Sequence, residues 1–387
     1  MTQDMDNILI VEASGRGFLS HYAHALALGL QQRGHRVRLL TAPWDELAGW
    51  PAPFERKAIL RPGLAGWRTL RTEVREFAPS VIHFQWLNDP VSTALFVGWA
   101  QRRGAAVVYT PHNLLPHRGR WMLTPLFRRL YHGFDRVVVR DTNMRWAASE
   151  ILDVDPDRMA MALGSPNIIA HPDAPRRLPA ELGPRQPGEI RALHFGHGNV
   201  RKGLQPLLQA LARLDCPPGL HLMLAGAGVA AAIDPAVLAA ARAQVRVSVI
   251  DRYLDPAEVG GLFAQSDLVT MPYAKLCRSP ILDLAAAFNK PVLRTDRVEA
   301  TRFDEGRHGW TVDSGDSLAF AATLASLAAA PAQVFDAQQA LARSPGVDAE
   351  MARLAVRHED IYQQAMAERH ARRPRHAVGA AALIAGE

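Results

Sequence analysis

The chain has 387 residues, a length that favours two domains over one. Hydrophobic residues make up 48% of it and charged residues 21%, which is a globular composition, and no run reaches the roughly 18 apolar residues of a membrane span. Its two cysteines, Cys216 and Cys277, are too few for a disulfide framework and too far apart for a zinc site. No basic region precedes a long apolar core at the N-terminus, so we expect no signal peptide and a cytoplasmic location.

The first half of the chain alternates between predicted strands and helices. Residues 7–11 predict a buried strand, 19–33 a helix that ends at Gly34, and 36–40 a second strand. This order is typical of an α/β domain with a parallel sheet. Further strands are predicted at 81–86, 105–110 and 135–139.

Two loops of this half follow predicted strands. Gly15 and Gly17 lie in the first, which lacks the third glycine of a dinucleotide fingerprint, so a tight turn that needs positive φ is an equally good interpretation. His112 lies in the loop after residue 110. Ligands bind beyond the carboxyl ends of parallel strands, so we expect His112 in a site; the alternative is a loop histidine bonded to the backbone.

The net charge of +6 favours an anionic partner. Nucleic acid is not expected, because no nucleic-acid motif accompanies the charge. In residues 118–131, Arg118, Arg120, Arg128 and Arg129 interleave with Trp121, Leu126 and Phe127. Such a segment suits the surface of an anionic membrane, although a helix that packs in the core with a solvated basic face is the commoner case.

A proline-rich stretch, residues 173–189, is the best candidate for a linker between domains. A strand at 191–195 then leads into the loop 196–203 and a helix at 204–214. Glycines in this loop let a ligand approach the backbone, and Arg201 and Lys202 supply cations near a helix start. The alternative is a structural turn with solvated cations.

The most informative stretch is 268–294. It predicts a strand at 268–271, a polar loop, an N-cap at Ser279 followed by Pro280, and a helix at 281–288. A strand, a loop and a helix N-terminus gather unpaired backbone N–H groups, which suits a phosphate or pyrophosphate. An ordinary βαβ unit without a ligand is the alternative. The remaining predictions are strands at 221–224, 245–250 and 292–293, helices at 258–264 and 351–370, and an alanine-rich helical region from 317.

These segments resemble the retaining glycosyltransferases of the GT-B fold, family GT4. The resemblance covers the K-G of Lys202 and Gly203, the T-x-H-N around His112, and the D-x-V-V-V from residue 135. The chain departs from the family pattern in the E-x7-E signature, where Lys275 and Asp283 replace the glutamates. His197 also stands where the family has an arginine, and Pro280 replaces a glycine.

The resemblance implies two Rossmann-like, doubly wound α/β domains that face a central cleft. Residues 1–172 would form the acceptor-side domain and 190–348 the nucleotide-sugar-binding domain. The helix 349–371 would pack back on the first domain, and the tail 372–387 is expected to be disordered.

The implied activity is transfer of a sugar from a nucleotide-sugar donor to an acceptor hydroxyl with retention, in the assembly of cell-surface polysaccharide or glycolipid. The acceptor would be a saccharide or a lipid-linked molecule, the enzyme would lie peripherally on the inner face of the membrane, and no metal or cofactor is expected. The catalytic candidates are His112, Lys202 and Asp283. The donor-binding candidates are Gly15, Gly17, His197, Gly198, Arg201, Lys202, Arg252, Tyr253, Ser279, Ile281 and Asp283.

Two other activities stay open. A GT-B sugar-nucleotide epimerase would need acid and base carboxylates in the cleft, which the sequence does not identify. A catalytically silent GT-B scaffold that binds sugar nucleotides or a partner enzyme is favoured by Lys275 and His197, which replace family residues.

Overall fold

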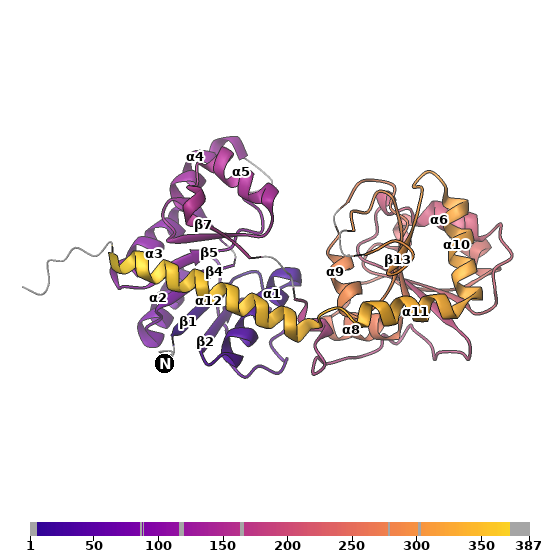
Figure 1. Ribbon diagram of the computed structural model, residues 1–387, viewed down its shortest axis with the longest axis horizontal. Helices are drawn as coiled ribbons and strands as arrows, with labels where there is room; N and C mark the ends of the chain where they lie inside the picture. Colours follow the sequence, from indigo (N-terminus) through magenta and orange to yellow (C-terminus); the bar gives the residue numbers. More distant parts are fainter. Residues whose placement is uncertain are drawn as a thin grey trace, which may run out of the picture. The chain divides into compact units, whose positions relative to one another are not determined.

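The computed structural model describes residues 6–85, 87, 89–115, 120–162, 166–277, 279–300 and 303–371. Internal contacts divide the chain into two compact units. Unit 1 contains residues 1–166 and 348–387, and unit 2 contains residues 167–347 (Figure 1). Residues 173–189, the predicted linker, lie within unit 2, and the predicted disordered tail lies outside the described residues.

The described part of unit 1 contains a seven-stranded parallel sheet in the order β3-β2-β1-β4-β5-β6-β7. The order reverses between β1 and β4, which makes this pair the switch point of a doubly wound sheet. The strands are β1 (Asn7–Glu12), β2 (Arg36–Thr41), β3 (Glu55–Ala58), β4 (Val81–Phe84), β5 (Ala106–Tyr109), β6 (Arg136–Val139) and β7 (Met159–Met161).

Helices cover both faces of this sheet. Successive strand residues point to opposite faces, so Leu9 and Val11 pack toward one set of helices while Ile8 and Ile10 are buried on the other side. One set consists of α2 (Leu64–Phe77), α3 (Pro90–Arg102), α4 (Arg120–Tyr131) and α5 (Thr142–Leu152). The other consists of α1 (Gly17–Gln32) and α12 (Val347–Ala371).

Helix α12 belongs to unit 1 although it comes last in the chain (Figure 1). It packs against α1 at Gly29, where a built Cβ would lie 2.9 Å from the Met351 carbonyl oxygen and 3.1 Å from the Ala355 Cβ. Farther along, the Arg357 Nε donates to the Met161 carbonyl at 2.9 Å. The last described helix of the chain is thus packed on elements from its N-terminal half.

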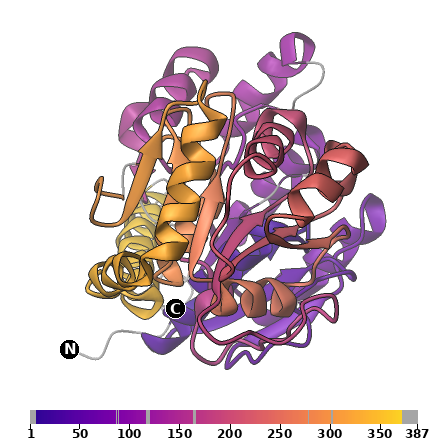
Figure 2. The ribbon, with the colours of Figure 1, turned by 90° about the vertical axis from the view of Figure 1, so that its right-hand side faces the viewer.

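The described part of unit 2 contains six parallel strands in the order β10-β9-β8-β11-β12-β13. In Figure 2 the orange helix α10 covers part of this sheet. The strands are β8 (Ile190–Phe195), β9 (Leu220–Ala225), β10 (Arg246–Ile250), β11 (Leu268–Met271), β12 (Val292–Thr295) and β13 (Gly309–Val312). The helices are α6 (Leu204–Leu211), α7 (Pro235–Arg242), α8 (Pro256–Gln265), α9 (Pro280–Ala287), α10 (Ser317–Ala329) and α11 (Pro331–Ala342).

A buried ion cluster lies at the N-terminal ends of β8, β9 and β10. The Glu189 carboxylate lies 2.9 Å from the Arg191 Nε, 2.6 Å from the Arg246 Nη1 and 2.8 Å from the His221 Nδ1. Arg191 is 1% exposed. Breaking one partner of such a buried group is strongly destabilising, because an uncompensated charge remains.

The predicted α/β class with two Rossmann-like domains is confirmed by these two doubly wound parallel sheets. Within the described ranges, no single helix is long and apolar enough to cross a membrane; the bent pair 317–329 and 331–371, at 89°, reaches that length and composition only together.

The packing of α12 on α1 leads to the first prediction. Gly29→Val should lower the free energy of unfolding of unit 1 by about 1–3 kcal/mol, because the added carbons have no room against Met351 and Ala355. Gly49→Val is the matched control, since a Cβ there meets nothing within 4 Å. The measurement is urea unfolding of both variants. Equal stability of the two variants would contradict the described packing.

Candidate functional site

Two loops meet at the switch point of unit 2. The strand order reverses between β8 and β11, and the loops after them are 196–203 and 272–279. The Ala274 N–H donates to the Arg201 carbonyl at 2.8 Å, and a Cβ on Gly203 would overlap the Pro272 carbonyl oxygen. Ligands bind beyond the carboxyl ends of the strands at such a point, so this is the strongest candidate site in unit 2.

Two side chains converge on Gly196 in this site, and a third lies near one of them. A Cβ built at Gly196 would overlap the Lys202 Nζ and would lie 3.3 Å from the Ile281 Cδ1. The Lys202 Nζ lies 5.7 Å from the ring centroid of Tyr273. Lys202 and Ile281 were predicted from separate motifs, and the fold brings them together; Tyr273 is a neighbour that the sequence reasoning did not assign to the site.

The ammonium of Lys202 is half-buried, and burial lowers the pKa of Lys202 to about 8. Cys277 opposes this shift and Arg201 adds to it. Among the described residues, no carboxylate lies within ion-pair distance of Lys202, and the Arg201 side chain beside it is exposed. A desolvated cation without a carboxylate favours an anionic ligand.

Helix α9 begins at the same loop. Ser279 is its N-cap, the hydroxyl accepts from the Ile281 N–H at 3.4 Å, and Pro280 occupies the first helical position. The predicted N-cap is therefore confirmed. Asp283 lies half-buried in the first turn. The helix N-terminus adds a partial positive charge to that of Lys202.

The turn that contains Gly198 packs against a second glycine turn, which contains Gly228. A Cβ on Gly198 would overlap the Gly228 carbonyl oxygen, and the Gly198 N–H donates to the Ala227 carbonyl at 2.9 Å. The Gly228 N–H donates to the Asp251 Oδ1 at 2.6 Å. His197 is exposed at the tip of the first turn. Glycine at 198 is thus required by the close approach of two backbones.

Arg252 is held by two carboxylates of unit 2. Its Nε and Nη2 lie 2.8 and 3.1 Å from the Glu181 oxygens, and its Nη1 and Nη2 both lie 2.8 Å from the Glu258 oxygens. Its neighbour Tyr253 is 64% exposed. A donor would therefore compete with these carboxylates, or with the Tyr253 carbonyl at 3.3 Å from the Arg252 Nη1, for the N–H groups of Arg252.

The glycine loop of unit 1 satisfies its own backbone. Gly15 and Gly17 have φ of +66° and +65°, as the tight-turn alternative predicts. The Gly15 N–H donates to the Glu12 Oε2 at 2.8 Å, and the Gly17 N–H donates to the Glu46 Oε1 at 2.6 Å. Glu12 is fully buried, and burial raises the pKa of its carboxyl despite these bonds. Both amides therefore already have carboxylate partners.

His112 follows β5 and is half-buried between Phe18 and Tyr22, whose ring centroids lie 6.0 and 5.8 Å away. Its Nδ1 lies 3.3 Å from the Arg140 Nη1, and its Nε2 lies 3.2 Å from the Gln85 Oε1. Arginine only donates, so Nδ1 accepts and Nε2–H donates. Burial, with Arg140 adding, lowers the pKa of His112 to about 3, and the ring is neutral at pH 7.

A buried hydrogen-bond network connects His112 to α12. The Gln85 Nε2 lies 3.1 Å from the His83 Nε2, and the His83 Nδ1 lies 2.7 Å from the Tyr362 hydroxyl. Thr110 adds a contact of 2.7 Å to the His83 Nε2. The partners of His112 are side chains, which the backbone-bonded alternative did not predict. The sequence reasoning also missed His83, Arg140 and Tyr362.

The segment predicted to contact a membrane is only partly exposed. Phe127 packs against the core of unit 1, as the alternative interpretation predicted, and Leu126 is half-buried. Met122 is 84% exposed, and Arg128 and Arg129 are exposed. Arg118 lies outside the described residues, as do the side chains of Arg120 and Trp121. No group of three or more His, Cys, Asp or Glu among the described residues is arranged to hold a metal.

Two family models match the chain. Residues 19–162 match Glycosyltransferase Family 4, and residues 189–330 match Glycosyl transferases group 1. The chain belongs to the glycosyltransferases. The predicted resemblance is confirmed over most of both units, and the protein is an enzyme of this family. None of the curated proteins compared matches it.

Solved structures similar to this glycosyltransferase share its fold at low identity. A glycosyltransferase from Rickettsia africae ESF-5 is 14% identical with a TM-score of 0.64, covering 94% of this chain and 99% of its own. Anabaena Alr3699/HepE in complex with UDP and glucose is 16% identical with a TM-score of 0.56, covering 95% and 99%. The lipopolysaccharide outer core galactosyltransferase WaaB is 13% identical with a TM-score of 0.54, covering 94% and 99%. At this identity the likeness shows the fold alone.

The second prediction concerns Lys202. Lys202→Gln should weaken binding of a nucleoside diphosphate by about 1.5–3 kcal/mol, the range for a charged hydrogen bond, as measured by calorimetry. Wild-type affinity should fall between pH 7 and pH 9, because the ammonium with a pKa of about 8 becomes neutral, and the variant should lack this additional loss.

The control for Lys202→Gln is Arg213→Gln, which removes an exposed charge just after α6. Its affinity should match the wild type. Equal affinity of all three proteins at pH 7 would contradict a diphosphate contact at Lys202.

The third prediction concerns acid stability. The pKa of His112 is about 3 in the folded chain and 6.5 when unfolded, so the folded state binds fewer protons and stability falls as pH drops below 6.5. Between pH 6.5 and pH 5 this group should cost unit 1 about 2 kcal/mol, a loss that His112→Gln should lack. Denaturant unfolding at both pH values checks this. If the wild type and His112→Gln lose the same stability between the two pH values, the side chain of His112 is solvated and the prediction is wrong.

Proposed function

We propose that the protein transfers a sugar from a nucleotide-sugar donor to an acceptor hydroxyl with retention of configuration. The observation that carries this proposal is the convergence of Lys202 and Ile281 on Gly196, beside the N-terminus of α9. A half-buried cation, a glycine turn and a helix N-terminus together suit a diphosphate leaving group. The proposal involves no metal.

Charge that develops on the leaving diphosphate is stabilised by groups that are already oriented. Lys202 supplies a desolvated ammonium, and the exposed Arg201 supplies a second cation. The N–H groups of the first turn of α9 add their dipoles, except at Pro280, which has none. Asp283 in that turn would bond the ribose or sugar of the donor. UDP-glucose is the first donor to test, because Anabaena HepE is solved with it.

His112 would place the transferring sugar or the acceptor. Both ring nitrogens have partners in the absence of substrate, so a sugar hydroxyl would have to replace Gln85 or Arg140. A neutral ring can accept that exchange without leaving a buried charge unpaired. The acceptor role therefore depends on the hydrogen-bond network rather than on proton transfer by an imidazolium.

We propose that the acceptor is a glycolipid or a cell-surface polysaccharide that is assembled at a membrane. Exposed residues on two helices of unit 1 support this role. Exposed Met122 and Trp146 lie on α4 and α5, together with exposed cations such as Arg129 and Arg145. Apolar and cationic side chains on neighbouring helices suit peripheral contact with anionic lipid. The galactosyltransferase WaaB, a structural neighbour, acts in the lipopolysaccharide outer core.

The fourth prediction tests the activity. A thermal-shift screen of UDP- and GDP-sugars should identify a stabilising donor, and that donor should be consumed faster when lipid-linked saccharide is presented in anionic vesicles than without acceptor. Transfer should fall with salt, because screening weakens attachment to the vesicle. Lys202→Gln serves as the donor-site control.

The outcomes separate three activities. Product with retained anomeric configuration supports the proposal. If the donor is converted to its epimer when no acceptor is present, the protein is an epimerase and the proposal is wrong. A donor that binds but is neither hydrolysed nor transferred with any acceptor would leave a binding scaffold, to which Lys275 and His197 in place of family residues would then point.

A further inference from the structure

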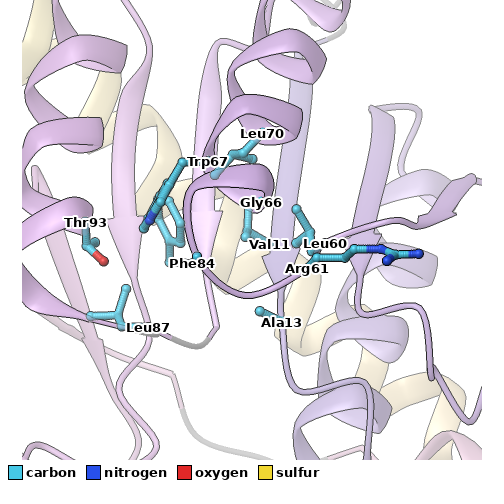
Figure 3. A pocket seen from close by; sticks show the side chains of 11 residues that line it. Val11, Ala13, Leu60, Arg61, Gly66, Trp67, Leu70, Phe84, Leu87 and Thr93 are labelled. Carbon is cyan, nitrogen blue, oxygen red and sulfur yellow. The ribbon is translucent and has the colours of Figure 1, made fainter.

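A small apolar pocket lies at the switch point of unit 1 (Figure 3). Its walls come from the carboxyl ends of β1 and β4 and from the first turns of α2 and α3. No residue of the predicted site lines it. The lining includes Val11, Ala13, Arg61, Trp67, Phe84 and Thr93.

The described part of the lining offers few hydrogen-bonding side chains to a ligand. Thr93 has its one hydroxyl, and the Thr93 Oγ1 already donates to the Asp89 carbonyl. The other side-chain donors are the Trp67 indole N–H and the Arg61 guanidinium. Val11, Leu70 and Phe84 at the base are 2–3% exposed. A sugar would find few partners here for the hydroxyls that it withdraws from water, whereas a hydrocarbon chain would gain burial.

The surroundings of the pocket are cationic and apolar. In Figure 3 the aliphatic part of Arg61 lines the pocket while its guanidinium extends away from the other lining side chains. Arg61 and Arg68 are exposed, and no carboxylate among the described residues lies within ion-pair distance of either. Leu64 on α2 and Leu95 on α3 are 76% and 67% exposed. An apolar slot beside unpaired cations matches a hydrocarbon chain with an anionic head.

The pocket shares β4 with the His112 network. Successive residues alternate faces, so Phe84 lines the pocket while His83 and Gln85 face the helix α12 side, where they bond to Tyr362 and His112. The pocket and the His112 network therefore lie on opposite faces of the sheet, near the carboxyl end of the same strand.

We propose that this pocket binds the first part of the hydrocarbon chain of a phosphate-bearing lipid acceptor, with Arg61 and Arg68 next to the phosphate. The proposal rests on the transferase function above and specifies its acceptor. It assigns Trp67, whose ring lies 5.4 Å from Phe96, as the aromatic wall of the chain site.

The first test is a chain-length series of n-alkyl phosphates, each below its micelle concentration, measured by calorimetry. Affinity should rise roughly fourfold for each methylene that enters the pocket and then level off. Methyl phosphate should not bind detectably. Arg61→Gln should weaken the alkyl phosphate several-fold and leave the matching alkyl alcohol unchanged.

The second test locates the chain. A brominated alkyl phosphate should quench tryptophan fluorescence in the wild type, lose most of that quenching in Trp67→Phe, and retain it in Trp146→Phe, which alters an exposed tryptophan of α5. Ala13→Leu, which fills the pocket, should abolish saturable binding while thermal unfolding stays cooperative.

Several results would overturn the proposal. These are affinity independent of chain length, quenching that survives Trp67→Phe, or unchanged binding by folded Ala13→Leu. Donor binding by Lys202 is measured in the same preparations. A donor that binds and is transferred to soluble saccharides with no alkyl binding refutes the pocket alone, and alkyl binding without any transfer refutes the transferase alone.

Discussion

The donor site proposed in unit 2 depends on one constraint: the ammonium of Lys202 is held partly out of water, and among the described residues no carboxylate lies beside it. Burial alone would push Lys202 toward its neutral form, and the pKa of about 8 shows how far that has gone. A diphosphate would reverse the shift, because an anion favours the charged form. Glycine at 196 follows from the same constraint, since any side chain there would occupy the space of the Lys202 ammonium.

In unit 1 the buried group is neutral rather than charged. Its central histidine is kept neutral by burial and by Arg140, and its tautomer is set by which neighbours donate and which accept. Tyr362 belongs to the last helix of the chain, so the orientation of His112 depends on α12 being docked on the sheet. The packing of that helix at Gly29 is in this sense part of the site.

Much of this followed from local pattern. Buried strands and the Ser279 N-cap are readable because alternation and capping are local properties. Helix α2 was missed although Trp67, Leu70, Val74 and Phe77 recur at helical spacing, so its signal was present but not used. The short edge strand β3 and helix α3 were missed because their apolar patterns are mixed. The His83 network was missed although period-two alternation places His83 and Gln85 on one face. Its partner Tyr362, 279 residues away in the chain, has no local signal.

In the proposed acceptor site, the two faces of β4 would serve the two parts of a lipid-linked sugar. The apolar pocket on the α2 and α3 side would take the chain, while the hydrogen-bonded side chains on the α12 side would orient a hydroxyl. These demands cannot be met on one face, because polar groups among the walls of a chain site would be left unpaired when the chain displaces water. A β-strand keeps the apolar and the polar surface apart, since its consecutive side chains point to opposite faces of the sheet. Under this proposal, the switch point between β1 and β4 would present one surface to each end of the acceptor.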